Sequence, residues 1–172
     1  MSTIQRVNFE PVSDVLPLCR RDFVLADPTL ADPTDAAVLV DGEWVILDTS
    51  YRILRAASIS SAGNAATVRS FPLWAERGRY DVQALSGRKM PVVWLGESEW
   101  DTRVYDATAT VGSGAQITAI MQPLKVASIT IGSRKYTGLV GHGGANDTNP
   151  VVGYVTKLPS GGKLRFRTGY RS

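Results

Sequence analysis

The last third of the chain consists of one strand-like segment after another, and this feature restricts the fold most. Each segment is rich in β-branched or aromatic residues and is bounded by Gly, Pro, Asn or Ser. Several short strands at such spacing are typical of a β-barrel or a β-sandwich, and no strand–helix alternation indicates a doubly wound α/β fold. We therefore predict an all-β domain over residues 36–172, a compact barrel or sandwich of short antiparallel strands. The segments are RVYDATATV (103–111), AQITAIMQPLKVASITIG (115–132), KYTGLVGHG (135–143), NPVVGYVTKL (149–158) and KLRFRTGYR (163–171).

The closing segment, KLRFRTGYR, carries a different kind of residue on each face of its expected strand. Leu164 and Phe166 alternate with Lys163, Arg165 and Arg167. Because successive side chains of a strand point to opposite faces, one face is apolar and the other is cationic. We expect the cationic face to contact a partner or to protect a strand edge from aggregation. The interface candidates here are Arg165, Arg167 and Arg171.

The clearest local pattern is a predicted β-hairpin, in which AAVLV and EWVIL flank the dipeptide Asp41-Gly42. This dipeptide suits the positive φ angles of a two-residue turn. Both faces of the hairpin are apolar near the turn, so it needs cover on each side, from the core or from a neighbouring subunit. Trp44 is therefore a further candidate for a partner interface. The predicted cross-strand pairs are Leu39 with Trp44 and Val38 with Val45.

The middle of the chain has weaker patterns. TSYRILRAASISSAGNA allows either a short helix or a strand through Ile53 and Arg55, and we favour the strand because residues 58–63 have the composition of a turn. Further on, MPVVWLGESEW predicts a short buried strand that ends in an exposed acidic tip around Glu97 and Glu99.

Residues 1–35 are expected to form an extended, acidic, proline-rich arm. The stretch ADPTLADPTD repeats a five-residue unit, and each Asp-Pro pair favours an extended backbone because proline restricts the residue before it. Two interpretations stay open, a surface loop or linker and an arm that lies on a partner subunit. The interface candidates in the arm are Asp27, Pro28, Asp32 and Pro33.

Charge is sorted along the chain. Residues 1–50 hold three basic and nine acidic side chains, residues 51–100 hold seven and four, and residues 101–172 hold nine and three. A chain that begins acidic and ends basic can attract another copy of itself or an oppositely charged neighbour. We therefore expect an assembly component rather than an enzyme.

The chain offers few groups for catalysis or for metal binding. His142 is the single histidine, with Asp147 five residues later in the same Gly-rich segment, and no serine stands in a nucleophile-elbow frame. Cys19 is the single cysteine, which excludes an intramolecular disulfide and leaves no usual set of zinc ligands. We expect no enzymatic activity, no cofactor and no metal, with His142 as a loop or interface residue.

Nucleic acid and membrane are not expected as partners. The C-terminal cations are interleaved with Phe166 and Tyr170, as in single-strand binders, but the net charge is only +3 and the acidic arm would compete. No stretch approaches the ~18 apolar residues of a membrane span. The first residues lack the basic-then-apolar order of a secretory signal, so we expect a protein made in the cytoplasm.

Two segments resemble a known class of virion protein. The first is AAVLVDGEWVILDTSYRI, which follows the arm, and the second is the closing NPVVGYVTKLPSGGKLRFRTGYRS. Both resemble head-decoration (cement) proteins of tailed double-stranded DNA bacteriophages, mainly over residues 36–54 and 149–172. The longer middle region departs from the small trimeric cement proteins. The resemblance implies a structural virion protein on the outer surface of the capsid. It would bind the major capsid protein and itself, as a dimer or trimer, and bridge neighbouring capsomers.

Two alternative functions stay open. One is a phage head–tail connector or tail structural protein, which would also be β-rich and self-associating. The other, from a different class, is a β-barrel module that binds a small ligand or single-stranded nucleic acid.

Overall fold

The chain folds into β-sheets. A computed structural model describes residues 9–12, 20–27, 39–40, 42–48, 50–55, 70–72, 89–93, 98–109, 114–145 and 147–168. These residues contain twelve strands and no helix. Every pair of named strands is antiparallel. The predicted all-β class is therefore confirmed.

The largest sheet has seven strands in the order β1-β7-β12-β11-β9-β10-β8. Its centre is built from two hairpins, β9–β10 and β11–β12. Strands β1 and β8 lie at the two ends of this order, and no pairing among the described residues joins them, so the sheet is open there rather than closed into a barrel. The strands are β1 (Phe9–Pro11), β7 (Glu99–Thr102), β8 (Gly114–Ala115), β9 (Pro123–Ile131), β10 (Arg134–His142), β11 (Gly153–Ser160) and β12 (Lys163–Thr168).

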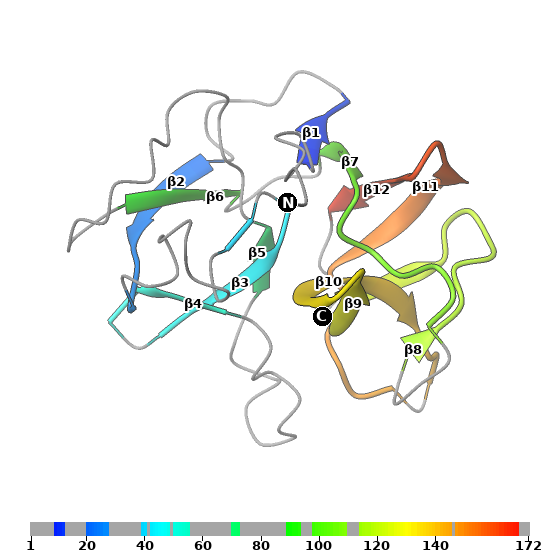
Figure 1. The fold of residues 1–172 in the computed structure, drawn as a ribbon. Coiled ribbons are helices and arrows are strands. Elements are labelled where there is room, and N and C mark those ends of the chain that lie inside the picture. The colour runs from blue at the N-terminus through cyan, green and yellow to red at the C-terminus, as the bar shows by residue number, and fades with distance from the viewer. Residues whose placement is uncertain are drawn as a thin grey trace.

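Two smaller sheets lie on the left in Figure 1, beside strands β7 to β12 on the right. One pairs β2 (Arg20–Val24) with β6 (Lys89–Val93). The other has β3 (Trp44–Leu47) between β4 (Ile53–Arg55) and β5 (Ser70–Pro72). A parallel bridge between Leu25 and Ile53 connects the end of β2 to β4.

The main core joins the β3 sheet to the large sheet. Trp44 of β3 packs against Phe166 of β12, with ring centroids 6.2 Å apart. Tilted ring pairs at this distance add to the free energy gained from burial alone. The buried members of this core are Trp44, Ile46, Trp100, Ile117, Leu124, Leu139, Val152, Val155, Leu164 and Phe166.

The two faces predicted for the closing strand are confirmed. Leu164 and Phe166 are fully buried in β12. Lys163 and Arg165 are partly exposed and Arg167 is exposed, so the cations lie on the opposite face. The alternation follows from the two-residue period of a strand.

The predicted hairpin is confirmed as a turn between Val40 and Glu43 and is wrong as a strand pair at Val45, while Asp41 lies outside the described residues. The Glu43 amide donates to the Val40 carbonyl at 3.1 Å, and Gly42 has a φ of 86°, which favours glycine. However, Val45 pairs with Arg55 on one side and with Phe71 on the other. Both edges of β3 are therefore occupied at Val45, whereas Val38 lies outside the described residues. Strand β4 confirms the strand favoured over a helix for this part of the chain.

Two predictions for residues 98–109 are wrong. Glu99, predicted to lie in an exposed acidic tip, instead begins strand β7 (Glu99–Thr102), in which Trp100 is fully buried; Glu97 lies outside the described residues. Residues 103–109, expected as a strand, make only an isolated parallel bridge between Tyr105 and Leu139. Asp106 turns the chain by accepting hydrogen bonds from the Thr108 amide and hydroxyl, at 2.8 and 2.9 Å.

Two pieces of the predicted arm belong to sheets. Strand β1 pairs with β7, and strand β2 pairs with β6. Within residues 1–35, these pieces are thus extended but paired with later parts of the same chain. The division of the chain at residue 35 stays a prediction.

Candidate interaction surface and ion-paired loop

The cationic face of β12 is partly neutralised by β7. The Arg165 guanidinium binds the Asp101 carboxylate through two hydrogen bonds, Nε to Oδ1 at 2.8 Å and Nη2 to Oδ2 at 3.1 Å. These hydrogen bonds raise the pKa of Arg165 above its usual value. Such a bidentate pair fixes the direction of the side chain. Arg165 therefore contributes to a mixed-charge surface rather than to a purely cationic stripe.

The other interface candidates are distributed over different environments. Arg167 and Asp27 are exposed. Trp44 is 1% exposed and lies in the core, so its large apolar surface covers the large sheet rather than facing a neighbouring subunit. The structure thus does not bring the predicted interface residues together into one patch among those it describes. Pro28, Asp32, Pro33 and Arg171 lie outside the described residues.

The aromatic residue predicted to accompany these cations is also buried. Phe166 has no exposed surface, so its ring cannot stack on a nucleotide base. Tyr170, the second aromatic of that pattern, lies outside the described residues. This arrangement removes Phe166 from the single-strand binding alternative.

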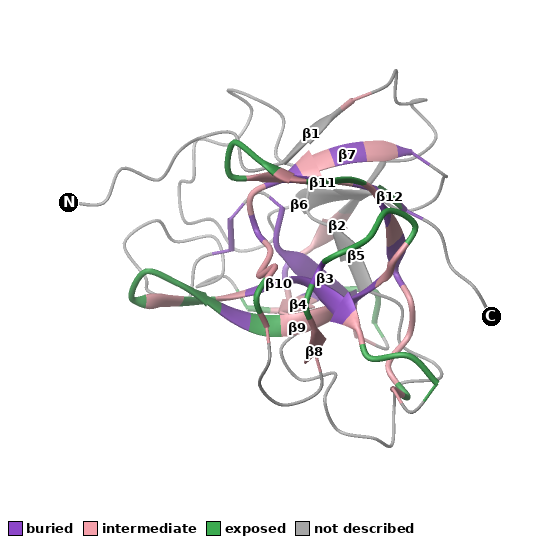
Figure 2. Cartoon of the chain, turned by 90° about the vertical axis from the view of Figure 1, so that its right-hand side faces the viewer, coloured by how far each residue is buried: buried purple, intermediate pink, exposed green. Residues whose placement is uncertain are grey.

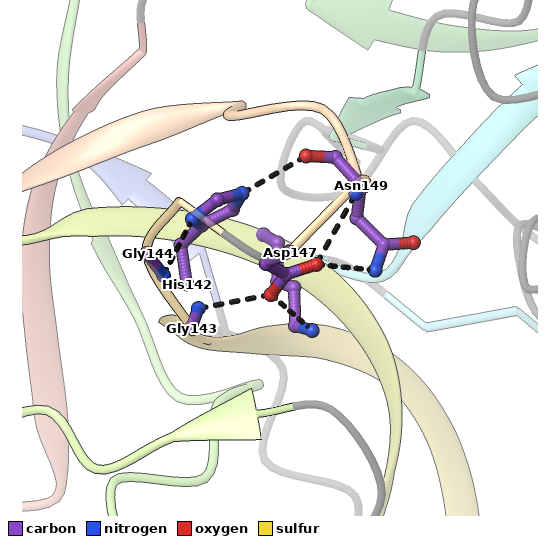
Figure 3. Close-up of polar contacts among 6 residues, drawn as sticks. His142, Gly143, Gly144, Asp147 and Asn149 are labelled. Carbon is purple, nitrogen blue, oxygen red and sulfur yellow. Dashed lines mark hydrogen bonds and ion pairs between the residues drawn. The ribbon is translucent and has the colours of Figure 1, made fainter.

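After β10, residues 143–145 and 147–149 lie around a buried ion pair (Figure 3). Lys125 of β9 lies with its Nζ 2.5 Å from Oδ2 of Asp147, and the two side chains are 1% and 5% exposed. The same Oδ2 accepts a hydrogen bond from the Gly143 amide at 2.9 Å. Oδ1 accepts from the backbone and side-chain nitrogens of Asn149, at 3.1 and 2.6 Å. Both carboxylate oxygens are therefore fully engaged.

These contacts decide the charge state of Asp147. Burial by itself raises the pKa of a carboxyl group. Here the Lys125 ammonium and the hydrogen bonds from Gly143 and Asn149 outweigh burial and hold the pKa of Asp147 well below its usual value. Asp147 is consequently ionised at neutral pH. Its contacts with Gly143 and Asn149 hold the loop against Lys125 of β9.

His142 is held by the same loop. Its Nδ1 accepts a hydrogen bond from the Gly144 amide at 3.2 Å, and its Nε2 lies 3.0 Å from the Asn149 carbonyl oxygen. An acceptor at Nδ1 and a donor at Nε2 define the neutral tautomer with its proton on Nε2. The oxygens of Asp147 bind Lys125, Gly143 and Asn149, and the ring nitrogens of His142 lie against Gly144 and Asn149, so these contacts do not form the carboxylate–imidazole bond of a hydrolytic triad. His142 is the last residue of β10 and pairs with Gly114, so it lies at the end of a strand and not within the loop that the sequence predicts.

A second buried charge joins the small β3 sheet to β10. Glu43 has no exposed surface; its Oε2 accepts from the Val40 amide at 2.9 Å and its Oε1 from the Thr137 amide at 3.1 Å. Arg55 Nη1 lies 3.5 Å from Oε1. Burial raises the pKa of Glu43, against the opposing effects of Arg55 and the two amides. Glu43 thus accepts a hydrogen bond from the Thr137 amide of β10, which points away from β9.

Sequence reasoning missed both buried charges. Lys125 stands in the apolar run QPLKVASITI, and Glu43 directly follows the turn dipeptide. A lone charge in an apolar strand is a signal for a buried pair, but its partner is distant in sequence: Thr137 is 94 residues from Glu43. No local pattern connects such residues.

The described residues also bear on metal binding and on membrane insertion. They contain no group of three or more His, Cys, Asp or Glu side chains that could hold a metal ion. They also contain no helix that is long and apolar enough to cross a membrane.

Comparisons with protein-family models, with curated proteins and with solved structures gave no match for this chain.

Proposed function

We propose that the protein is a structural virion protein of a tailed bacteriophage, which binds the outer surface of the capsid and bridges neighbouring capsomers. The proposal rests first on the resemblance of residues 36–54 and 149–172 to head-decoration proteins. The observation that best supports it is the contact between Trp44 and Phe166. One residue comes from each segment, so the two parts that carry the resemblance belong to one packed unit.

The proposed action is mechanical. A protein that binds only the assembled, expanded lattice stabilises that lattice by mass action. Bridging neighbouring capsomers then opposes the outward pressure of packaged DNA. The major capsid protein is the proposed partner, and the site of action is the outside of the virion.

The mixed-charge surface of β7 and β12 is the part of the described structure that we assign to capsid contact. Arg167 is exposed there, and Arg165 is held in a fixed direction by Asp101. Charged groups at the rim of an interface govern the rate and the specificity of association. Capsid binding should therefore weaken as salt is raised.

Co-sedimentation of the full chain with expanded and unexpanded capsids tests the proposal. We expect binding to expanded capsids, and we expect Arg167→Glu to weaken it by about tenfold through charge repulsion at the rim. The matched control is Lys135→Glu, which makes the same charge change at an exposed position of β10. No binding by the unmodified chain, or equal losses in both variants, would contradict the assignment.

The arm is tested by substitution rather than by deletion. Strands β1 and β2 lie within residues 1–35 and pair with β7 and β6, so removing the arm would also remove strands from two sheets. Asp27→Ala with Asp32→Ala keeps these strands. We expect this double variant to bind expanded capsids more weakly than the unmodified chain, and unchanged occupancy would remove the arm from the account.

A further inference from the structure

Within the part of the chain that the structure describes, strand β9 has one covered edge and one edge that is open along most of its length. It pairs with β10 from Leu124 to Ile131. On its other side it meets β11 only at Leu124 and Pro123, which pair with Gly153 and Tyr154. Among the residues that the structure describes, none pairs with this second edge beyond Leu124.

The hydrogen bonds of β10 show which backbone groups of β9 point to the open edge. Leu139, the partner of Val126, uses its amide and carbonyl on the far side of β10, with Val104 and Asp106. The Leu139–Val126 pair therefore exchanges no hydrogen bonds within the hairpin, and the backbone groups of Val126 point away from β10. The Leu124 carbonyl agrees with this pattern, since it accepts from the Val152 amide on that side.

The alternation extends along the strand. Thr137, the partner of Ser128, also directs its amide away from β9, to Glu43. Val126, Ser128 and Thr130 are two residues apart, so all three present an amide and a carbonyl to the open edge. The edge is thus a regular row of donors and acceptors.

This edge lacks the features that protect exposed strands. Residues 126–131 read VASITI, with no charge, no proline and no glycine. Natural edge strands usually carry a charged residue, a proline or a bulge that prevents pairing with another chain. The neighbouring cation, Lys125, is 1% exposed and is engaged with Asp147. Nothing in the side chains of this segment opposes the addition of a strand.

We propose that this edge binds the same edge of a second copy of the chain, antiparallel, with a two-fold axis at Ser128. Ser128 then lies opposite the second copy's Ser128, and Val126 lies opposite the second copy's Thr130. Three such opposed pairs exchange roughly six backbone hydrogen bonds. The contact is isologous, so it closes as a dimer instead of continuing as a fibre.

Side chains and charges favour this occupant. Ala127, Ile129 and Ile131 share one face of β9, where Ile131 is 43% exposed at the end of the strand. Figure 2 shows the turn that follows it as an exposed loop at the left of the view. In the two-fold arrangement Ile131 lies opposite the second copy's Lys125, whose charge is already paired, and beside its Ala127. The dimer therefore covers an exposed apolar side chain and opposes no unpaired like charges. Trp44, the earlier candidate for self-association, is in the core.

Light scattering of the full chain and of three Ser128 variants, over a wide range of concentration, tests the proposal. We expect the unmodified chain and Ser128→Ala to be dimers, because alanine leaves the backbone edge intact. Ser128→Lys should weaken dimerisation by at least about tenfold, since it sets two like charges opposite each other. Ser128→Glu should do the same, and an equal mixture of the Lys and Glu variants should form the dimer again.

Recovery in the mixture shows that the single variants are folded and that the axis passes near Ser128. A monomeric unmodified chain would overturn the proposal, as would a Ser128→Lys variant that associates as strongly as Ser128→Ala. The proposal stands on the sheet geometry alone. Failure of capsid binding in the experiments above would therefore leave it untouched.

Discussion

Replacing Asp147 by asparagine should destabilise the fold strongly, because it removes the carboxylate that is paired with the buried ammonium group of Lys125. Lys125 is 1% exposed and its Nζ lies 2.5 Å from Asp147 Oδ2. Removing one partner of a buried ion pair costs about 3–5 kcal/mol, mostly because the remaining charge stays buried without compensation. In either orientation the asparagine NH2 group would also face groups that are donors themselves, Lys125 and the Gly143 amide at one position or the two Asn149 nitrogens at the other. We therefore expect Asp147→Asn to lower the free energy of unfolding by about 3–5 kcal/mol at neutral pH.

Urea unfolding followed by circular dichroism measures this loss. Asp106→Asn is a matched control, because Asp106 also caps a turn through Oδ1, where its donors are the amide and hydroxyl of Thr108 rather than an ammonium group; its cost should stay below about 1 kcal/mol. Lys125→Met in the Asp147→Asn background should recover part of the loss, since it removes the uncompensated charge. A loss of less than about 1 kcal/mol in Asp147→Asn would refute the argument from buried charge.

The pH dependence provides a second readout of the same pair. The folded-state pKa of Asp147 is lowered from 3.8, so its contribution to stability is complete above that value and is lost as the pH falls through the folded-state pKa. The difference in unfolding free energy between the unmodified chain and Asp147→Asn should therefore shrink as the pH falls below about 4. A difference that is constant with pH would contradict the assignment of the charge.

Three further substitutions test other parts of the fold. Trp44→Ala should lower the free energy of unfolding by about 3–5 kcal/mol in urea, because it empties the centre of the core. Gly138→Ala should cost about 1–3 kcal/mol by the same measurement, since its new methyl group would lie 2.6 Å from the Val104 carbonyl oxygen. Glu43 has a folded-state pKa above 4.5, so the folded state binds more protons and stability falls as the pH rises from 4.5 to that pKa. Glu43→Gln should abolish this fall, and a pH titration of the unfolding free energy that is identical in both proteins would contradict the account of Glu43.

Local patterns predicted those parts of the fold that local physics determines. The Asp41-Gly42 turn and the alternation of Leu164 and Phe166 with cations depend only on backbone preferences and on the two-residue period of a strand. The all-β class follows from many such segments.

Contacts between distant residues determine the parts that the sequence did not indicate. Glu97 and Glu99 gave the sequence around β7 the composition of an exposed tip. In the structure Trp100 is buried there, and Asp101 binds Arg165, which lies 64 residues later. Val45 takes its partners from β4 and β5 instead of from the preceding residues. The Lys125–Asp147 pair likewise depends on how β9 and the loop after β10 meet.

The most direct test of the proposed function is the position of the protein on the virion. Immunogold labelling of bacteriophage virions, or density from their electron microscopy, measures this position. The account predicts label over the whole capsid surface. Label confined to one vertex or to the tail would assign the protein to a connector or tail role, and absence of label from intact virions would contradict a structural virion protein altogether.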